Sequence, residues 1–299
     1  MFKKGVYHTP ALLKETIAFL RIKPEERYID ATLGGGGHSE EILKAGGWLL
    51  AIDQDPDAIK NAKIRFSACP SPSRVVIVKG NFARIGEIAK ENDFTKVDGI
   101  LFDLGVSSHQ LETAERGFSF NLEGPLDMRM DPELSVTAKD LINALSEKEL
   151  EELFSKLGEE KFARRFARAV CRERETKKIE TCDELAEIIV KSAPPRGKFD
   201  RTHPATRIFQ ALRIAVNDEL NNLREALPQA VELLNQKGRL VILSFHSLED
   251  GIVKKFFWEK EKEGLLKIIT QRPVEPGEEE INENPRARSA KLRVAEKLL

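Results

Sequence analysis

The sequence predicts an α/β protein with a largely parallel sheet and an inserted all-helical domain. Between residues 28 and 103, short apolar runs alternate with helical or loop sequence. The alternation stops near residue 112 and resumes only after residue 214. Short apolar runs separated by helices are typical of a parallel sheet that is covered on both faces. A long helical block inside such a pattern indicates an insertion.

The first strand leads into a glycine turn. Residues 28–30 form a short apolar run, Gly34 to Gly37 follow, and a helix is predicted to begin at Ser39. A second strand, residues 48–52, ends in Asp53. Glycines let ligand atoms approach the backbone, and the helix start offers free N–H groups. An acidic residue after the next strand is placed to accept hydrogen bonds from ribose hydroxyls. Together these features predict a pocket for an adenosine-containing cofactor.

The glycine turn lacks the features of phosphate-binding loops. A dinucleotide fingerprint requires Gly-x-Gly-x-x-Gly, but Ser39 stands where the third glycine would fall. No lysine follows the glycines, as it would in a P-loop. S-adenosylmethionine contains adenosine without phosphate and therefore fits better than a dinucleotide. A flexible glycine turn that binds no ligand is the alternative.

The remaining strands are short apolar runs. Residues 75–79 and 97–103 continue the sheet, and Asp103 ends the second of them at the edge where open α/β sheets bind ligands. The sheet resumes at residues 238–244. Two final strands, residues 266–271 and 291–295, are expected to form a hairpin at the sheet edge.

Helix start signals mark the insertion. Ser146 with Glu149, and Thr181 with Glu184, match capping boxes. A further helix is predicted to begin at Pro204. Its apolar positions on one side are Ile208, Leu212, Ala215 and Leu220. We therefore expect a first sheet segment at 1–112, a helical substrate-recognition domain at 113–213 and a second sheet segment at 214–299.

Composition predicts a soluble cytoplasmic protein. No apolar run of the 299 residues approaches the roughly 20 needed to span a membrane, and the N-terminus lacks the apolar core of a secretory signal. The three cysteines, Cys69, Cys171 and Cys182, are odd in number and lack metal-ligand spacing. We therefore expect reduced thiols and no metal site.

Basic residues gather within the insertion although the net charge is only −1. Residues 161–178 contain eight Lys or Arg: Lys161, Arg164, Arg165, Arg168, Arg172, Arg174, Lys177 and Lys178. A second group comprises Arg196, Lys198, Arg201, Arg207 and Arg213. Such segregation predicts a phosphate-binding face, with an ordinary solvated helix surface as the alternative.

Seven sequence blocks together resemble the RsmH (MraW) family of bacterial ribosomal RNA methyltransferases. They are Asp30–Ser39, Asp98–Ser108, Glu115–Phe120, Gly124–Asp131, His203–Arg207, Ser244–Asp250 and Asn284–Ser289. The similarity runs from His8 to the C-terminus. It implies a Rossmann-like class I S-adenosylmethionine-dependent methyltransferase sheet. It also implies N4-methylation of a cytidine in the decoding region of 16S ribosomal RNA, with this RNA contained in the small ribosomal subunit, and it leaves a homodimer open.

The resemblance also implies site residues. Cofactor contacts would fall on Gly34, Gly35, Gly36, Gly37, His38, Asp53, Phe82, Asp103 and Gln110. We expect Asp103, or the backbone carbonyl beside it, to accept a hydrogen bond from the target amine. The alternative is that the Asp103 carboxylate serves only the cofactor. Contacts to the base are expected from His203, Arg207, Ser244 and His246, although such residues at helix starts and strand ends often satisfy backbone groups instead. A non-catalytic ribosome assembly factor that binds S-adenosylmethionine is the alternative function.

Overall fold

The computed structural model describes residues 10–67, 69, 72–195 and 203–299. The chain divides into two compact units, a sheet unit of residues 1–107 and 220–299 and a helical unit of residues 108–219. The division lies a few residues outside the expected limits of 113 and 213, because helix α5 (Ser108–Glu112) and the end of α10 belong to the helical unit. Four residues singled out above, His8, Arg196, Lys198 and Arg201, lie outside the described residues.

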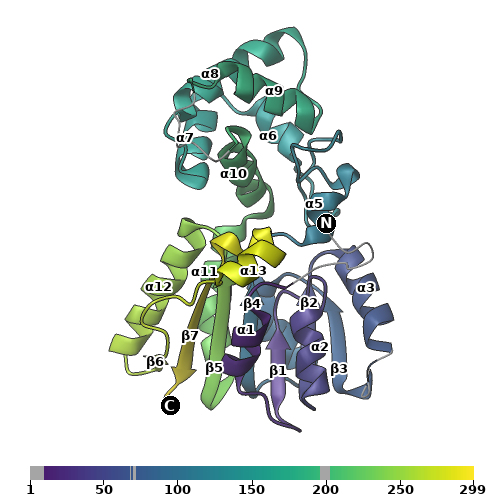
Figure 1. The fold of residues 1–299 in the computed structure, drawn as a ribbon, viewed down its shortest axis with the longest axis vertical. Helices are drawn as coiled ribbons and strands as arrows, with labels where there is room; N and C mark the ends of the chain where they lie inside the picture. Colours follow the sequence, from purple (N-terminus) through teal and green to yellow (C-terminus); the bar gives the residue numbers. More distant parts are fainter. Residues whose placement is uncertain (1–9, 68, 70–71, 196–202) are drawn as a thin grey trace. The chain divides into compact units, whose positions relative to one another are not determined.

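The sheet unit contains a seven-stranded sheet with the order β3-β2-β1-β4-β5-β7-β6 (Figure 1). The strands are β1 (Arg27–Asp30), β2 (Trp48–Asp53), β3 (Val75–Lys79), β4 (Val97–Asp103), β5 (Leu234–Ser244), β6 (Leu266–Ile268) and β7 (Lys291–Lys297). The first five are parallel, whereas β7 pairs antiparallel with both β5 and β6. The predicted hairpin at the sheet edge is therefore confirmed.

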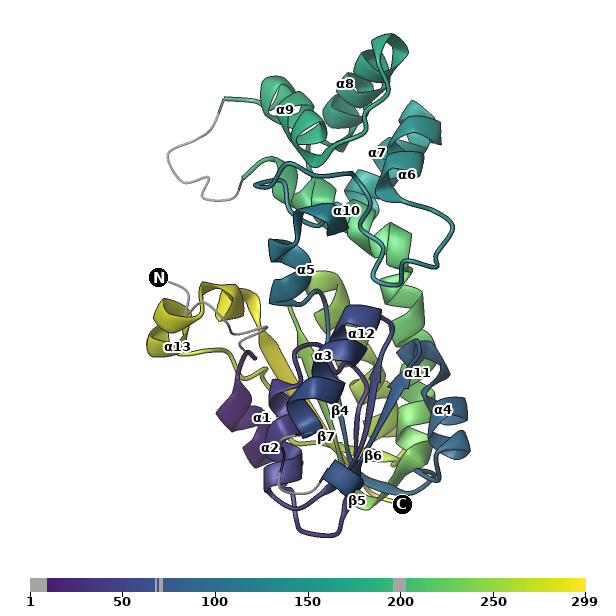
Figure 2. The ribbon, with the colours of Figure 1, turned by 90° about the vertical axis from the view of Figure 1, so that its right-hand side faces the viewer.

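Helices cover both faces of this sheet, as its apolar strands require. Figure 2 shows α1, α2 and α3 on one face and α4 and α11 on the other. The helices of this unit are α1 (Leu13–Leu20), α2 (Gly37–Lys44), α3 (Pro56–Ser67), α4 (Ile85–Glu91), α11 (Glu219–Leu233), α12 (Ser247–Lys262) and α13 (Glu278–Glu283). Alternate strand residues enter opposite cores: Leu49 and Leu101 face the α2 side, whereas Leu50 and Phe102 face the α11 side.

The helical unit contains α5, α6 (Ala138–Ala144), α7 (Glu147–Gly158), α8 (Ala163–Thr176), α9 (Cys182–Ser192) and α10 (Ala205–Asn217). Both predicted capping boxes are confirmed, at the starts of α7 and α9. A third, Thr137 with Asp140, opens α6. The expectation that Leu220 continues α10 is wrong, because Asp218 adopts a left-handed conformation (φ 49°) and ends that helix.

Several element limits differ from the expected ones, most of them by one or two residues. Helix α2 begins at Gly37 rather than Ser39, because Gly36 already serves as its N-cap. Strand β6 ends at Ile268, where the chain turns away from regular pairing, and β5 begins four residues early at Leu234. No helix among the described residues is long and apolar enough to cross a membrane.

Candidate functional site

The glycine turn is held in a conformation that only glycine adopts easily. Gly34 and Gly36 have positive φ values of 50° and 74°. A Cβ atom on Gly36 would lie 3.0 Å from Cζ of Phe66 on α3. The Gly35 carbonyl accepts a hydrogen bond from Nη1 of Arg65 at 2.7 Å. Helix α3 therefore fixes the turn from one side.

Asp53, at the end of β2, fixes the turn from the other side. Its Oδ2 accepts a hydrogen bond from the Gly34 N–H at 2.7 Å, and its Oδ1 accepts one from the Asp55 N–H at 2.8 Å. Burial raises its pKa to about 6, opposed by these two hydrogen bonds. Each carboxylate oxygen has a second lone pair, so Asp53 can still accept a ligand hydroxyl.

Asp30 and Thr32 connect the turn to β4, and neither residue is among those expected from the sequence to form the site. Asp30 is 1% exposed and accepts hydrogen bonds from Oγ of Ser39 at 2.7 Å and from the Thr32 N–H at 3.2 Å. Oγ1 of Thr32 in turn accepts from the Asp103 N–H at 2.5 Å. Asp30 is the last residue of β1, just as Asp103 is the last residue of β4. This shared position at a strand end is the sequence signal that could have identified Asp30 as a site residue.

Asp103 is the least satisfied carboxylate at this edge. Its Oδ2 lies 3.5 Å from Nδ1 of His38, and its buried Oδ1 has no hydrogen-bond partner among the described residues. Burial, together with the negative charges of Asp30 and Glu249, raises its pKa well above the ordinary value. A buried acceptor without a donor is costly to the fold. Asp103 is therefore available to a ligand that brings a proton or a positive charge.

Ser244 and His246, at the end of β5, make backbone contacts in this structure. Ser244 is 2% exposed, and its Oγ lies 3.4 Å from the Lys291 carbonyl. Nδ1 of His246 accepts from the Glu249 N–H at 3.4 Å and so caps α12. Glu249 accepts a hydrogen bond from the Phe245 N–H at 2.8 Å and lies 3.2 Å from Nε2 of His246. Both side chains therefore satisfy backbone groups in this structure.

Phe82 also contacts the core. It begins the short 3₁₀ helix Phe82–Arg84 and packs edge-on against Phe102, with ring centroids 5.7 Å apart. Its ring is partly buried against the α11-side core, which leaves part of the ring accessible.

Three of the expected site residues belong to the helical unit. Gln110 is 5% exposed on α5. His203 accepts a hydrogen bond from the Ala205 N–H at 3.2 Å and stacks on Phe120, with ring centroids 4.5 Å apart. Arg207 donates from Nη1 to the Glu159 carbonyl at 3.1 Å. The sheet unit by itself brings together Gly34 to His38, Asp53 and Asp103.

The buried carboxyls give the folding equilibrium a pH dependence of defined sign. Asp30 and Asp53 have pKa values of about 6 in the folded chain, against an ordinary 3.8. From about pH 4 to 6 the folded chain holds protons that the unfolded chain has released. The contribution of these two carboxyls to the free energy of unfolding is therefore fully present below about pH 4. It is lost as the pH rises through 6.

We expect Asp30→Asn to stabilise the cofactor-free protein at pH 7 by up to about 3 kcal/mol and to leave its stability near pH 4 unchanged. The amide removes the buried charge but retains an oxygen that accepts from Thr32 or Ser39. Urea denaturation at the two pH values measures the difference. An equal change at both would contradict the assignment of the charge to Asp30.

Comparisons with known proteins agree over nearly the whole chain. The MraW methylase family model matches residues 5–298. Ribosomal RNA small subunit methyltransferase H of Carboxydothermus hydrogenoformans is 48% identical over 307 aligned positions, covering 97% of this chain and 98% of its own length. The protein of the same name from Brevibacillus brevis is 46% identical, covering 98% of each chain. A solved rRNA methylase from Streptococcus thermophilus aligns with all of this chain and 99% of its own at 11% identity and a TM-score of 0.47, a remote likeness.

Proposed function

Because this chain belongs to the MraW methylase family, it is an S-adenosylmethionine-dependent methyltransferase, and we propose that its product is N4-methylcytidine in the decoding region of 16S ribosomal RNA. The observation that carries the proposal is the buried Asp103 carboxylate at the end of β4, whose Oδ1 has no donor among the described residues. The small ribosomal subunit is the proposed partner and the cytoplasm the proposed place of reaction.

The strand ends favour a cofactor without phosphate. Four carboxylates, Asp30, Asp53, Asp103 and Glu249, are buried or nearly buried at the carboxyl edge. Their charges would repel a pyrophosphate and attract a sulfonium or an ammonium group. Asp53 would accept from the ribose hydroxyls, and the turn from Gly34 to Gly37 would lie against the amino-acid portion. These residues therefore fit S-adenosylmethionine.

The N4 amine of cytidine is a poor nucleophile, because its lone pair is conjugated into the ring. S-adenosylmethionine supplies a methyl group on a positively charged sulfonium. Asp103 accepts a hydrogen bond from an N4 proton, which localises the lone pair on nitrogen and balances the developing positive charge. Its raised pKa makes the carboxylate a stronger proton acceptor, suited to receive that proton. Alignment of the amine with the methyl group can itself lower the barrier by roughly 7–11 kcal/mol.

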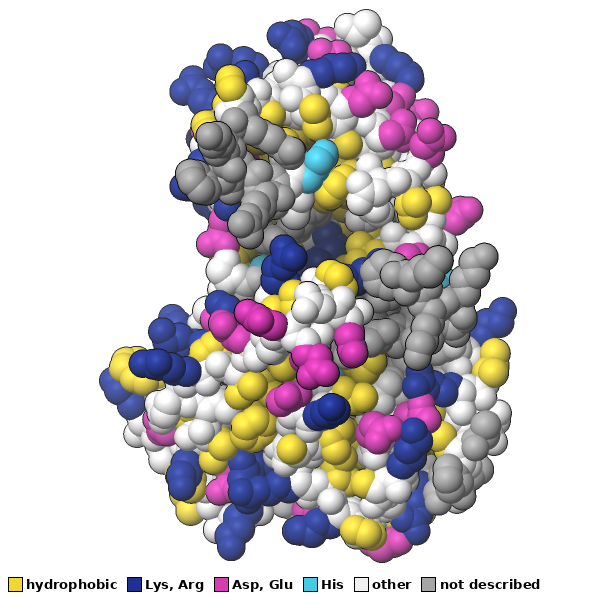
Figure 3. Space-filling view, viewed as in Figure 1, with side chains coloured by type: hydrophobic (Ala, Val, Ile, Leu, Met, Phe, Trp, Pro, Cys, Tyr) yellow, Lys and Arg dark blue, Asp and Glu magenta, His cyan; other side chains and the backbone are white. Residues whose placement is uncertain are grey.

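The basic face of α8 is suited to contact RNA phosphates. Figure 3 shows Lys and Arg side chains gathered over this end of the helical unit. Arg164 and Arg165 are exposed and have no carboxylate partner among the described residues. Arg168 is partly neutralised by Glu147 at 3.4 Å. Unpaired cations are the ones that bind phosphate without first losing an ion pair.

We expect the double variant R164E/R165E to bind single-stranded RNA about 10- to 100-fold more weakly at low salt, because two phosphate contacts become repulsive. The slope of log Kd against log salt should fall by about 1.4, since each lost contact contributes about 0.7. A filter-binding titration at several salt concentrations measures both. Lys191→Glu on α9 is the control, because Lys191 is already paired with Glu187 at 2.9 Å. Equal effects of the two changes would argue against a binding face on α8.

The proposed reaction is tested by identifying the labelled nucleoside. Small ribosomal subunits from cells that lack the modification are incubated with the protein and methyl-labelled S-adenosylmethionine, and the RNA is digested. The proposal expects label in N4-methylcytidine from the decoding region. Label in another nucleoside, or cofactor binding without transfer to any assembly intermediate, would overturn it.

A further inference from the structure

A groove on the sheet unit lies outside the cofactor edge. It forms where α12 passes over β6 and β7, and it encloses about 330 Å³. Its lining includes Gly251, Lys254, Lys255, Trp258, Ile268 and Arg293. A Cβ atom on Gly251 would meet nothing within 4 Å, so the helix surface is open at that turn.

The charge of the groove is positive. Its lining residues include three cations and no carboxylate. Arg293 is neutralised by Asp250, whose Oδ1 accepts from its Nε at 2.6 Å. Lys255 has only Glu259 nearby, at 3.8 Å, and Lys254 has no acidic partner among the residues described. The two adjacent, exposed lysines on α12 are therefore available to bind an anion.

An aromatic ring stands next to these lysines. Trp258 is 52% exposed, although large apolar side chains are usually buried, and it follows Lys254 by one helical turn. Nζ of Lys262 lies 3.4 Å from the centre of a Trp258 ring. Figure 3 shows Lys and Arg side chains around hydrophobic ones along this flank of the unit. An exposed indole among cations presents a stacking surface beside positive charge.

We propose that this groove binds a single-stranded segment of the RNA substrate, with a base stacked on Trp258 and the adjoining phosphates on Lys254 and Lys255. Stacking with aromatic rings and contact of the backbone with cations are the two recognition modes of single-stranded nucleic acid. A neutral apolar partner would not use the lysines, and a purely anionic one would not use the indole. The inference rests on the proposed function for the identity of the ligand as RNA.

Fluorescence of Trp258 gives a direct test that does not depend on catalysis. The chain has two tryptophans, so Trp48→Phe leaves Trp258 as the only indole. Titration of the full-length W48F protein with a short single-stranded RNA should quench this emission to a saturating value. K254E/K255E should weaken binding about tenfold or more and lower the salt slope by about 1.4. Filter binding, which does not depend on an indole, should show that W258A weakens RNA binding about 5- to 100-fold.

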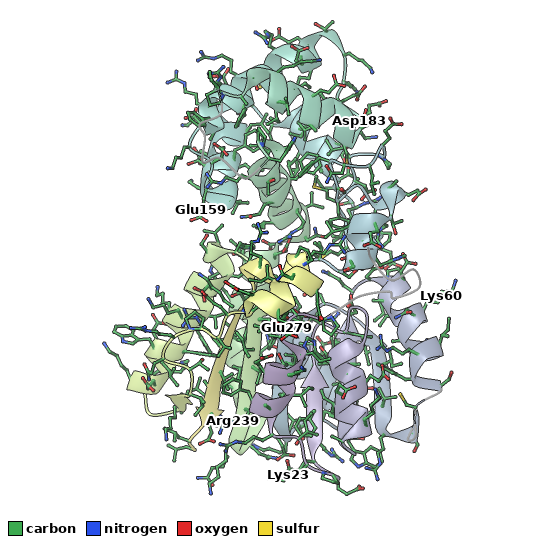
Figure 4. The ribbon with its side chains drawn as sticks, in the orientation of Figure 1. Lys23, Lys60, Glu159, Asp183, Arg239 and Glu279 are labelled. Atoms are coloured by element: carbon green, nitrogen blue, oxygen red, sulfur yellow. The ribbon has the colours of Figure 1, made fainter. Side chains whose placement is uncertain are left out.

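Lys60→Glu provides the matched control. Lys60 is an exposed lysine on α3, next to the opposite edge of the sheet, and Figure 4 shows its side chain pointing away from the unit. This change should alter the Kd for RNA by less than about twofold. Thermal denaturation of each variant establishes that the fold is retained.

The outcomes separate this inference from the proposed reaction. Quenching by RNA in a protein that forms no N4-methylcytidine would support the groove and refute the reaction. Methylation with no quenching and an unchanged Kd in K254E/K255E would overturn the groove. If W258A instead dissociated a dimer and left RNA binding intact, the groove would be an interface between copies and the inference would be wrong.

Discussion

Asp103→Asn is expected to lower the kcat of methyl transfer by about 100- to 1,000-fold and to leave the protein folded. The amide is a weaker acceptor and cannot receive a proton from N4, so the transition state loses the stabilisation that the carboxylate provides. The fold should not suffer, because the change removes a buried charge that is repelled by Asp30 and Glu249. Single-turnover rates with unmodified small subunits measure the loss, and thermal denaturation checks the fold.

Asp98→Asn is the matched control for this prediction. Asp98 lies at the opposite end of β4, where it accepts hydrogen bonds from the Arg27 N–H at 3.0 Å and from Asn235 at 2.8 Å. The kcat of the Asp98→Asn variant should stay within about twofold of the wild-type value. If Asp103→Asn raised the KM for the cofactor but left kcat unchanged, Asp103 would be a cofactor ligand only.

Gly36→Val is expected to weaken cofactor binding by at least about 30-fold. A β-branched residue is strongly disfavoured at φ 74°, at a cost of about 1–3 kcal/mol. Its Cβ would also press on the Phe66 ring, 3.0 Å away. The turn must therefore leave the conformation that caps α2. Isothermal titration with S-adenosylhomocysteine measures the change in Kd.

Gly264→Val separates backbone strain from damage to the turn. Gly264 follows α12 and has nearly the same φ, 73°, with nothing within 4 Å of a Cβ. The substitution should lower the melting temperature but keep the cofactor Kd within about twofold of the wild-type value. Equal losses of affinity in the two variants would show that Gly36 acts through global stability alone.

Local sequence signals predicted most of the elements of the fold. Apolar runs located every strand, and β3 and β4 have the predicted limits. Capping boxes located the starts of α7 and α9 because both partners lie within four residues of each other. The left-handed residue Asp218 that ends α10 was missed, because such a conformation depends on packing beyond the local sequence. The hydrogen bond from the Leu12 N–H to Oε1 of Glu280, at 2.6 Å, could not be predicted either, because its partners lie 268 residues apart in the sequence.

The candidate site was predictable in part. Strand ends in a parallel sheet meet at one edge, so the placement of Asp53 and Asp103 followed from the strand assignments alone. Hydrogen-bond partners did not follow, because they depend on register and on side-chain rotamers. Asp30, with its bonds to Ser39 and Thr32, was therefore missed. Ser244 and His246 carry functional groups suited to a base, but only the structure shows their backbone contacts.

The strand order has a consequence for synthesis of the chain on the ribosome. Strand β4 lies in the middle of the sheet, and its outer neighbour β5 begins at Leu234, 131 residues after Asp103. At about 5–20 residues per second, the nascent β4 edge waits roughly 7–26 s for its partner. The helical unit emerges entirely within that interval. An unpaired central strand is prone to aggregate, so the nascent protein needs protection at this edge until β5 has been translated.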